Sequence, residues 1–263
     1  MSLEIKDINI LGQDIDGCYN VTDGNFIYKV SKGCNIKVKS GIYAYILDVT
    51  NNENINVDID DEATLKYIVM SSQSTNRKFK NSGELIYIEI SLDKTNEDIC
   101  VDLVNENASF NGKTLSLAKS IESNYTQRVN HLAKRTESNI SNYGIALEKG
   151  QLMFDTTGFI ERGMSKSKCA QLAHGVVMDE ESVVKSKPIL LINEYDCLAN
   201  HGAAIGKMSD ETLFYLMSRG LTRNEAFLLV LKGIVKPFLD EIPQDSLKEE
   251  TNKRFNDLIN KEQ

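Results

Sequence analysis

Four side chains of the kinds that bind transition metals lie close together in one short segment: Glu194, Asp196, Cys197 and His201. Imidazole, thiolate and carboxylate groups are all ligands for iron and related metals. A single histidine is more often a structural residue that forms hydrogen bonds, so the spacing alone does not decide between the two roles. The sequence nevertheless makes His201 and Cys197 candidate metal ligands.

The five cysteines are spread irregularly along the chain, and no C-x-x-C pair occurs among them: Cys18, Cys34, Cys100, Cys169 and Cys197. An odd number with this spacing argues against a disulfide framework and predicts a reducing compartment. The missing ligand pairs also argue against a preformed zinc or iron–sulfur site within one chain. Each cysteine is therefore interpreted first as a small buried side chain.

Patterns that mark common enzyme sites are absent. The segment 202–208 (GAAIGKM) has only three residues between its glycines, and Met208 stands where a phosphate-binding P-loop needs a hydroxyl. We expect instead a tight passage, assisted by glycine, from the last strand into a helical region. No G-x-S-x-G motif and no H-x-x-x-H pair occurs. The chain is therefore predicted not to be an enzyme and to carry no nucleotide.

The composition describes a folded, acidic protein. The chain has 263 residues, with 30 Lys and Arg against 38 Asp and Glu, so its formal net charge is −8. An acidic balance argues against binding to nucleic acid or to an anionic membrane, because both need a basic surface. The first residues lack the pattern of a signal peptide, and no apolar run reaches about 18 residues. A cytoplasmic location is expected.

Strand-forming segments separated by turns fill residues 1–207. Stretches such as 85–90 (LIYIEI) and 99–103 (ICVDL) alternate apolar and polar side chains, which is typical of strands with one buried face. No amphipathic helix of about a dozen residues interrupts them, and this argues against βαβ units. The region is therefore predicted to be mainly β.

A polar pair followed by a small residue recurs in the turns, at Asp61-Glu62-Ala63, Glu106-Asn107-Ala108, Glu148-Lys149-Gly150 and Glu180-Glu181-Ser182. Recurring turns suit a β-solenoid, in which each coil covers its neighbour. A sandwich of two sheets produces nearly the same pattern. Periodicity alone leaves these two folds open.

Residues 208–263 carry a helical pattern instead, and two or three helices are expected there. Capping residues and helix breakers mark their boundaries. The signals are an N-cap at Ser209, a stop at Gly220, a capping box at Thr222–Glu225, a kink or break at Pro237 and a third helix from about Leu247 to Ile259.

Four motifs follow one another between about residues 130 and 243. Residues 131–139 (HLAKRTESN) fit H-x-x-x-x-T-x-S, and residues 186–192 (SKPILLI) fit S-x-P-x-L-x-I. Residues 200–206 (NHGAAIG) fit H-G-A-x-x-G, and residues 211–221 (ETLFYLMSRGL) contain a helix of the form LFYLxSRG. In this order the motifs resemble those of the SufB/SufD family, the scaffold subunits of the SUF machinery for iron–sulfur cluster assembly. Residues 1–110 carry no matching motif.

The resemblance implies a right-handed parallel β-helix followed by a small helical domain, which favours the solenoid over the sandwich. It implies that the helices at 210–219 and 223–240 dock on a SufC-like ABC ATPase. It also implies pairing with a second SufB/SufD-type subunit, identical or paralogous. The implied cofactor is an iron–sulfur cluster, held transiently at a subunit interface.

The chain departs from the family pattern at one important position. The SufB branch uses a cysteine on a late strand for the nascent cluster, and counting back from Pro188 without gaps puts that position at Ala173. Cys169 lies four residues earlier. The H-G-A form around His201 is more like the SufD branch, whose histidine is implicated in cluster assembly or iron handling. The resemblance thus carries over His201 and Cys169 as site residues, and Cys197 joins them from the spacing.

The sequence therefore predicts a β-helix scaffold domain at residues 1–207, with residues 1–35 irregular or forming a strand cap, and a helical ATPase-docking domain at 208–263. The N-terminal helical extension of many family members is missing, which suggests a reduced version, and pairing with itself stays open beside pairing with a paralogue. The predicted function is a scaffold for a nascent iron–sulfur cluster, worked by an ATPase partner. Two alternatives stay open: a structural adaptor of the same complex without cluster ligands, and a β-solenoid enzyme acting on acidic polysaccharide.

Overall fold

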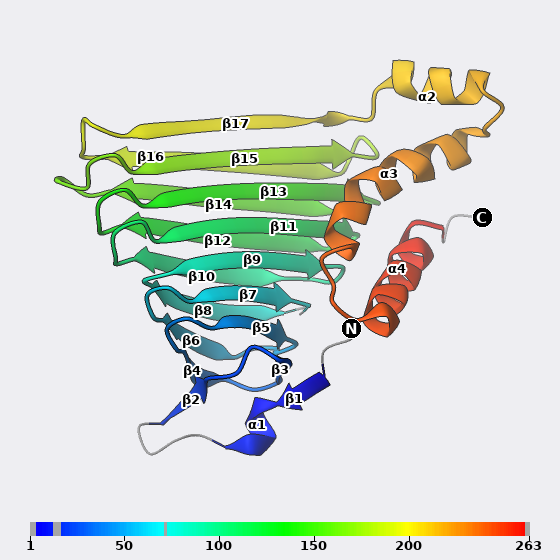
Figure 1. The fold of residues 1–263 in the computed structure, drawn as a ribbon. Helices are drawn as coiled ribbons and strands as arrows, with labels where there is room; N and C mark the ends of the chain where they lie inside the picture. Colours follow the sequence, from blue (N-terminus) through cyan, green and yellow to red (C-terminus); the bar gives the residue numbers. More distant parts are fainter. Residues whose placement is uncertain (1–3, 13–16, 71–72, 261–263) are drawn as a thin grey trace.

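The structure is a computed structural model that describes residues 4–12, 17–70 and 73–260. Within these residues, neighbouring strands pair in parallel, and successive strands alternate between a nine-stranded and an eight-stranded sheet (Figure 1). Each even-numbered strand and the odd-numbered strand after it form one coil of a solenoid. This parallel arrangement confirms the β-helix-like fold and excludes the sandwich, whose strands are antiparallel.

The odd-numbered strands form the nine-stranded sheet, called here the odd sheet: β1 (Glu4–Asp7), β3 (Phe26–Val30), β5 (Tyr43–Asp48), β7 (Thr64–Val69), β9 (Glu84–Ser91), β11 (Ser109–Lys119), β13 (Glu137–Leu147), β15 (Lys168–Val177) and β17 (Leu198–Lys207). The even-numbered strands form the even sheet: β2 (Cys18–Val21), β4 (Cys34–Val38), β6 (Asn54–Ile59), β8 (Ser74–Asn81), β10 (Asn96–Leu103), β12 (Glu122–His131), β14 (Gln151–Ile160) and β16 (Val183–Ile192). A single helical turn, α1 (Ile8–Leu11), follows β1.

The solenoid begins earlier than the alternating pattern indicated. In the segment 1–35, for which we expected an irregular or strand-like cap, β1 pairs with β3 and β2 pairs with β4 in the two sheets. These first strands are only four or five residues long. Short strands carry little periodicity, which explains why the sequence did not reveal them as coils.

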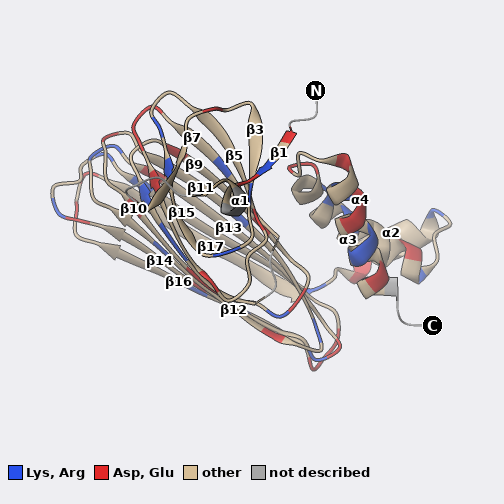
Figure 2. Cartoon of the chain, turned by 90° about the horizontal axis from the view of Figure 1, so that it is seen from below, with Lys and Arg blue, Asp and Glu red and all other residues tan. Residues whose placement is uncertain are grey.

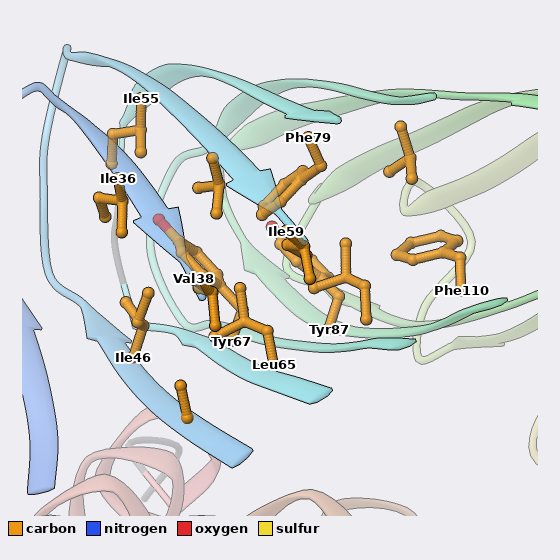
Figure 3. Close-up of a cluster of buried hydrophobic side chains, with 14 of the residues drawn as sticks. Ile36, Val38, Ile46, Ile55, Ile59, Leu65, Tyr67, Phe79, Tyr87 and Phe110 are labelled. Carbon is orange, nitrogen blue, oxygen red and sulfur yellow. The ribbon is translucent and has the colours of Figure 1, made fainter. Parts of the chain in front are cut away.

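Apolar side chains fill the space between the two sheets. The alternation in β6 is typical: Ile55, Val57 and Ile59 are buried, whereas Asn54 and Asn56 are exposed. Figure 3 shows the core of the first coils, in which equivalent side chains stack from coil to coil. Tyr67 and its register partner Tyr87 lie with ring centroids 6.0 Å apart and planes nearly parallel. Stacking of neighbouring coils is what buries this face.

One set of turns places a small, buried or half-buried residue just before each odd strand from β7 to β17. The preceding residue adopts the left-handed conformation at Glu62, Asn107, Arg135 and Lys166. The small residues that follow align from coil to coil, and we call this set the corner ladder: Ala63, Gly83, Ala108, Thr136, Ser167 and Cys197. Two of the four recurring tripeptides, those ending in Ala63 and Ala108, belong to this ladder.

The helices begin where their caps predict. α2 (Asp210–Ser218) has Ser209 as N-cap, and α3 (Arg223–Leu239) has the predicted capping box between Thr222 and Glu225. The third is α4 (Asp245–Asn260). The expected break at Pro237 is wrong, because α3 continues through it to Leu239. Pro237 lies in the last turn, where its missing N–H costs a single hydrogen bond to the carbonyl of Gly233.

Two of these helices cover the outer face of the odd sheet. Leu231, Val235 and Phe238 of α3 and Phe255 of α4 share one apolar cluster with strands β9, β11 and β13. Ion pairs add to it: Lys66 Nζ lies 2.7 Å from Glu241, and Arg254 lies 2.5 Å from Asp93. Figure 2 shows the helices gathered on one side of the sheets, with acidic and basic residues interspersed over the molecule. The division at residue 208 stays a prediction, since helices and solenoid share a core.

A search of the described helices finds none that is long and apolar enough to cross a membrane.

Candidate metal site at the open end of the solenoid

The last coil of the solenoid is open. β16 and β17 stand at the ends of their sheets, and each has only one neighbour among the described strands (Figure 1). Side chains that would face the interior in an earlier coil are therefore exposed along β17. This end displays large apolar side chains, including Leu191, Leu198 and Ile205, and Leu198 is 66% exposed. A surface of this kind is unusual unless another chain covers it.

His201 lies on β17, on the side that faces the interior. Its register partner on β15 is Gln171, whose side chain is buried between the sheets, whereas His201 itself is exposed. The tight passage expected at 202–208 would have put His201 at the end of the last strand, but β17 continues to Lys207 before α2 begins. The expected tight passage at 202–208 is wrong for the same reason: residues 202–207 are extended strand.

Cys169 lies inside the solenoid on β15 and is only 1% exposed. Its neighbours in register are Ser138 on β13 and Ala199 on β17. The sulfur packs against Gly158 of the even sheet, where an added Cβ would come within 2.4 Å of Sγ. Burial raises the pKa of the Cys169 thiol, while a hydrogen bond with Ser138 lowers it and nearby Cys197 raises it further.

Cys197 is the last residue of the corner ladder and is half-buried. Its thiol donates a hydrogen bond to the carbonyl oxygen of Glu194 at 3.2 Å. Burial raises the pKa of this thiol, and the charges of Glu194 and Asp196 raise it further. Cys197 therefore holds its proton more firmly than a free cysteine does.

The three predicted site residues lie near one another on β15, on β17 and just before β17, but they do not form a closed site. The register partner of Cys169 in the last coil is Ala199. Cys197 lies two residues before Ala199, and His201 lies two residues after it. This offset corresponds to on the order of 8 Å between Cα atoms for each pair. Within the described ranges, no group of three or more His, Cys, Asp or Glu side chains is placed to hold a metal ion. A complete ligand set would need donors from elsewhere.

The two acidic residues of the spacing-based group do not join these three. Glu194 accepts hydrogen bonds from three backbone N–H groups, those of Gly163 at 2.7 Å, Tyr195 at 2.8 Å and Asp196 at 3.0 Å. These bonds hold the pKa of Glu194 below its usual value. Its carboxylate thus braces the turn that carries Cys197.

Ala173, the position expected for the SufB-type cysteine, is a buried residue of β15 opposite Asn142 and Ala203. The register of β15 runs without a break from Lys168 to Val177, so the strand has no bulge. None is needed, because residues four apart on a strand face the same side. Cys169 therefore faces the interior as Ala173 does.

The other two histidines have contacts that fix them in place. His131 is fully buried and bonds through both ring nitrogens, to Thr136 at 2.8 Å and to Ser138 at 2.9 Å. His174 points outward, where its ring stacks on Tyr143 at 5.0 Å. The family motif H-x-x-x-x-T-x-S at 131–138 is thus a hydrogen-bonded group inside the corner between two coils.

Sequence reasoning missed a set of polar side chains inside the last coils. Gln127, Asn142 and Thr156 form hydrogen bonds of 2.8–3.3 Å with one another between the sheets. Asn142 Oδ1 and Gln171 Oε1 are buried, and neither has a hydrogen-bond partner within the described part of the chain. The signal was present, since these amides occupy inward positions of the alternating pattern. Gln171 is the register partner of His201, so a buried polar side chain lies directly beneath this histidine.

Comparison with known proteins now decides the family. Residues 24–234 match the family described as "SUF system FeS cluster assembly, SufBD core domain". The chain belongs to this family. Its SUF membership and the resemblance inferred from the four motifs are thereby confirmed.

Several curated relatives of this SufBD core protein carry related names. The iron–sulfur cluster assembly protein SufD of Bacillus subtilis is 28% identical over 224 residues, which cover 82% of this chain and 50% of SufD. SufB of the same organism is 29% identical over 137 residues, covering 51% of this chain and 30% of SufB. A SufBD family protein of Mycobacterium tuberculosis is 32% identical over 137 residues, covering 51% of this chain and 16% of that protein. The chain thus spans about half of SufD and less of the others.

Proposed function

We propose that this chain is a non-enzymatic, SufD-like scaffold that holds iron or a nascent iron–sulfur cluster at its open end, together with a second subunit of the same family. The observation that carries the proposal is the open last coil. It presents His201 beside the thiols of Cys169 and Cys197, with too few ligands for a complete site. Imidazole and thiolate are both iron ligands. Iron and sulfide are the cargo of this reaction, so transient and incomplete ligation suits a scaffold.

A second SufB/SufD-type subunit would complete the site. The free edges of β16 and β17 offer backbone hydrogen-bonding groups, and Leu191, Leu198 and Ile205 offer apolar area around them. A partner that added strands to these edges would bury this area and bring its own side chains to His201. Whether that partner is identical or paralogous is open to experiment.

Docking of a SufC-like ABC ATPase is proposed for the outer face of α2 and α3. Phe214, Tyr215 and Met217 of α2 and Leu229 of α3 are exposed, and Phe214 is 73% exposed. Such a cluster of large apolar side chains is typical of a protein interface. α2 follows β17 almost directly, so a movement of the docked ATPase would reach the strand that carries His201. ATP binding would then shift the population between two arrangements of the open end.

The first experiment replaces the exposed histidine. In the anaerobically purified complex, His201→Ala should lower the iron and sulfide content, because an exposed ligand is lost. The melting temperature should stay within about 1 °C, since exposed positions contribute little to stability. The matched control is His174→Ala, a histidine on the neighbouring strand that points outward. Unchanged iron in His201→Ala, or an equal loss in the control, would contradict the ligand role and support the adaptor alternative.

The second experiment tests the ATPase face without removing the helices. Deleting residues 208–263 would expose the apolar cluster that α3 and α4 cover, so surface changes are the better test. The double variant Phe214→Ser, Leu229→Ser should abolish co-purification with the ATPase while the fold persists. Lys253→Ser, at an exposed position of α4, is the control. Retained co-purification of the double variant would refute this docking face.

The polysaccharide alternative needs carboxylates in a surface groove that also binds an acidic polymer, and one groove of the solenoid bears on it. A groove of about 410 Å³ lies on the even sheet and is lined by asparagines, hydroxyl residues and the acids Glu53, Glu97 and Asp98. Its described lining contains no Lys, Arg or His. An acidic polymer would be repelled from such a groove.

A further inference from the structure

The two strand edges at the open end of the solenoid differ in what they offer to another strand. In a parallel sheet, alternate residues of a strand direct their N–H and C=O groups to one neighbour, and the residues between them direct theirs to the other side. β16 and β17 each have one neighbour among the described strands, so half of their backbone groups face a free edge (Figure 1). The hydrogen bonds to β14 and β15 show which half this is.

The free edge of β16 has a gap at its centre. Val183 N donates to the carbonyl oxygen of Gly150 at 2.9 Å, and Asn193 N donates to that of Ile160 at 3.0 Å. The odd-numbered residues therefore bond to β14, and the even-numbered residues face the free edge. Pro188 is one of the latter, and proline has no N–H to donate. A strand paired with this edge would keep one carbonyl oxygen without a donor, which is costly once that oxygen is buried.

Two lysines also protect the edge of β16. Lys185 and Lys187 stand on either side of Ser186, and both are exposed. Proline and lysine on an edge strand are two means by which β proteins prevent pairing with another chain. The proline of the motif at 186–192 thus has a physical reason: it marks β16 as a protected edge.

The free edge of β17 has no such gap. Leu198 N donates to the carbonyl oxygen of Ser167 at 3.0 Å, so the even-numbered residues of β17 bond to β15. The odd-numbered residues of 199–207 face the free edge, and none of them is proline. His201 is among them, so its backbone lies at the edge that a partner strand would meet. The segment 198–206 contains no Asp, Glu, Lys or Arg.

An uncharged edge of this kind can pair with a copy of itself. It presents alternating donors and acceptors, which match those of an identical strand related by a twofold axis. Two chains with a net charge of −8 repel each other overall, and β17 adds no acidic side chain to that repulsion. At the edge of β16 the same symmetry would bring Lys185 and Lys187 near their counterparts in the other copy.

We propose that the open end docks a strand on one edge only: β17 of a second copy of this chain pairs with the free edge of β17, while Pro188 and the two lysines keep the edge of β16 unpaired. The inference rests on the proposed function in treating the open end as a subunit interface, and it names the edge and the occupant. Pairing at β17 places the second copy beside His201. The site needs such a copy, since the described residues of one chain offer too few ligands.

Sedimentation of the purified chain over a range of concentrations tests the docking edge. The unmodified chain should form a dimer. Ala203→Pro removes one N–H from the middle of the free edge of β17 and should raise the dissociation constant of the dimer by about tenfold or more. Ser186→Pro is the matched control, because it removes an N–H from the free edge of β16 and should leave the dissociation constant unchanged. Both variants should keep their melting temperature, since neither N–H has a partner among the described strands.

Amide hydrogen exchange of the unmodified chain gives a second readout that needs no proline variant. As the concentration rises, exchange should slow at the N–H groups of His201, Ala203 and Ile205 and stay fast at those of Ser186 and Leu190. A chain that stays monomeric, an equal loss of pairing in Ser186→Pro, or protection along the edge of β16 would overturn the proposal.

The variant His201→Ala separates this proposal from the proposed function. It keeps the backbone N–H at the edge of β17, so it should form the dimer as the unmodified chain does. Its iron content reports on ligation alone. A dimer with unchanged iron would contradict the ligand role of His201 and support the docking edge.

Discussion

Arg77 is fully buried between the two sheets, where it forms ion pairs with Asp48 and Glu97. Glu89 lies in the same buried cluster and accepts a hydrogen bond from Tyr87 at 3.2 Å. Three carboxyl groups thus share one guanidinium away from water. Not all of them can be ionised, because an uncompensated buried charge is very costly. Burial accordingly raises the pKa of Glu89 well above its usual value and that of Glu97 to about 7.

The raised pKa of Glu97 predicts how stability depends on pH. In the unfolded chain this carboxyl ionises near 4.5, so between pH 4.5 and 7 the folded form holds a proton that the unfolded form lacks. The contribution of Glu97 to the free energy of unfolding therefore falls as pH rises through this window, by on the order of 3 kcal/mol. His131 acts in the opposite sense, since its pKa of about 4 makes stability rise with pH.

Comparison with Glu97→Gln separates the two effects. The variant keeps an acceptor for Arg77 and Thr75 but cannot ionise, while His131 is unchanged. The difference in unfolding free energy, measured by denaturant titration at several pH values, should favour the unmodified protein most at pH 4.5 and shrink toward pH 7.5. A difference that is constant with pH would show that Glu97 ionises normally in the folded protein.

The candidate site shows how much a single sequence reveals. His201, Cys197 and Cys169 could be named from residue type, spacing and family resemblance. That Cys169 stands opposite Ala199, and not opposite His201, depends on the register between β15 and β17, which the length of the intervening turns determines. The burial of Glu89 could not be predicted from the sequence for another reason. On β9 the helices bury the outward face too, so the alternation no longer separates inside from outside.

At the scale of the elements, local signals predicted the helix starts well. Ser209 accepts a hydrogen bond from Thr212 N, and Thr222 and Glu225 form a reciprocal capping box. Both motifs act over a few residues, so the sequence alone suffices to find them. The effect of Pro237 and the first short strands depended on tertiary packing, which no local pattern contains. The strands of the middle coils were readable because one face is polar and the other apolar.

The two caps predict different consequences for stability. Thr222→Ala should lower the free energy of unfolding of the whole chain by about 1 kcal/mol, because α3 shares its core with the odd sheet. Ser209→Ala should leave the melting temperature nearly unchanged, since α2 buries only Leu213 and frays by itself. Calorimetry reports the first effect and amide exchange in α2 the second. Equal losses of melting temperature in both variants would mean that α2 is coupled to the core.

At the scale of the whole molecule, the fold is nearly one-dimensional. Each coil contacts mainly its neighbours, and such solenoids lose structure from their ends. The open end at β17 and the short strands β1 to β3 are therefore the least protected parts of the solenoid. The site proposed at the open end is consistent with this, because a site that accepts and releases cargo needs a part of the fold that can rearrange.

The helices make the middle coils of the solenoid less independent of one another. α4 and the end of α3 lie across several coils at once, through the shared apolar cluster and the ion pairs of Glu241 and Arg254. These contacts between the helices and several strands couple coils that would otherwise unfold one by one. The strands β7 to β13 should thus open as one cooperative unit with α4.

Native-state hydrogen exchange of Phe255→Ala tests this coupling. Phe255 is 1% exposed and lies in the cluster between α4 and the odd sheet, so its truncation should cost about 3–5 kcal/mol. If α4 couples these coils, amide protection should fall together in α4 and in β9, β11 and β13, and not in α4 alone. Phe214→Ala, at an exposed position on α2, is the control and should change neither. Loss of protection confined to α4 would show that the solenoid is held by its own stacking and that the helices serve the partner surface only.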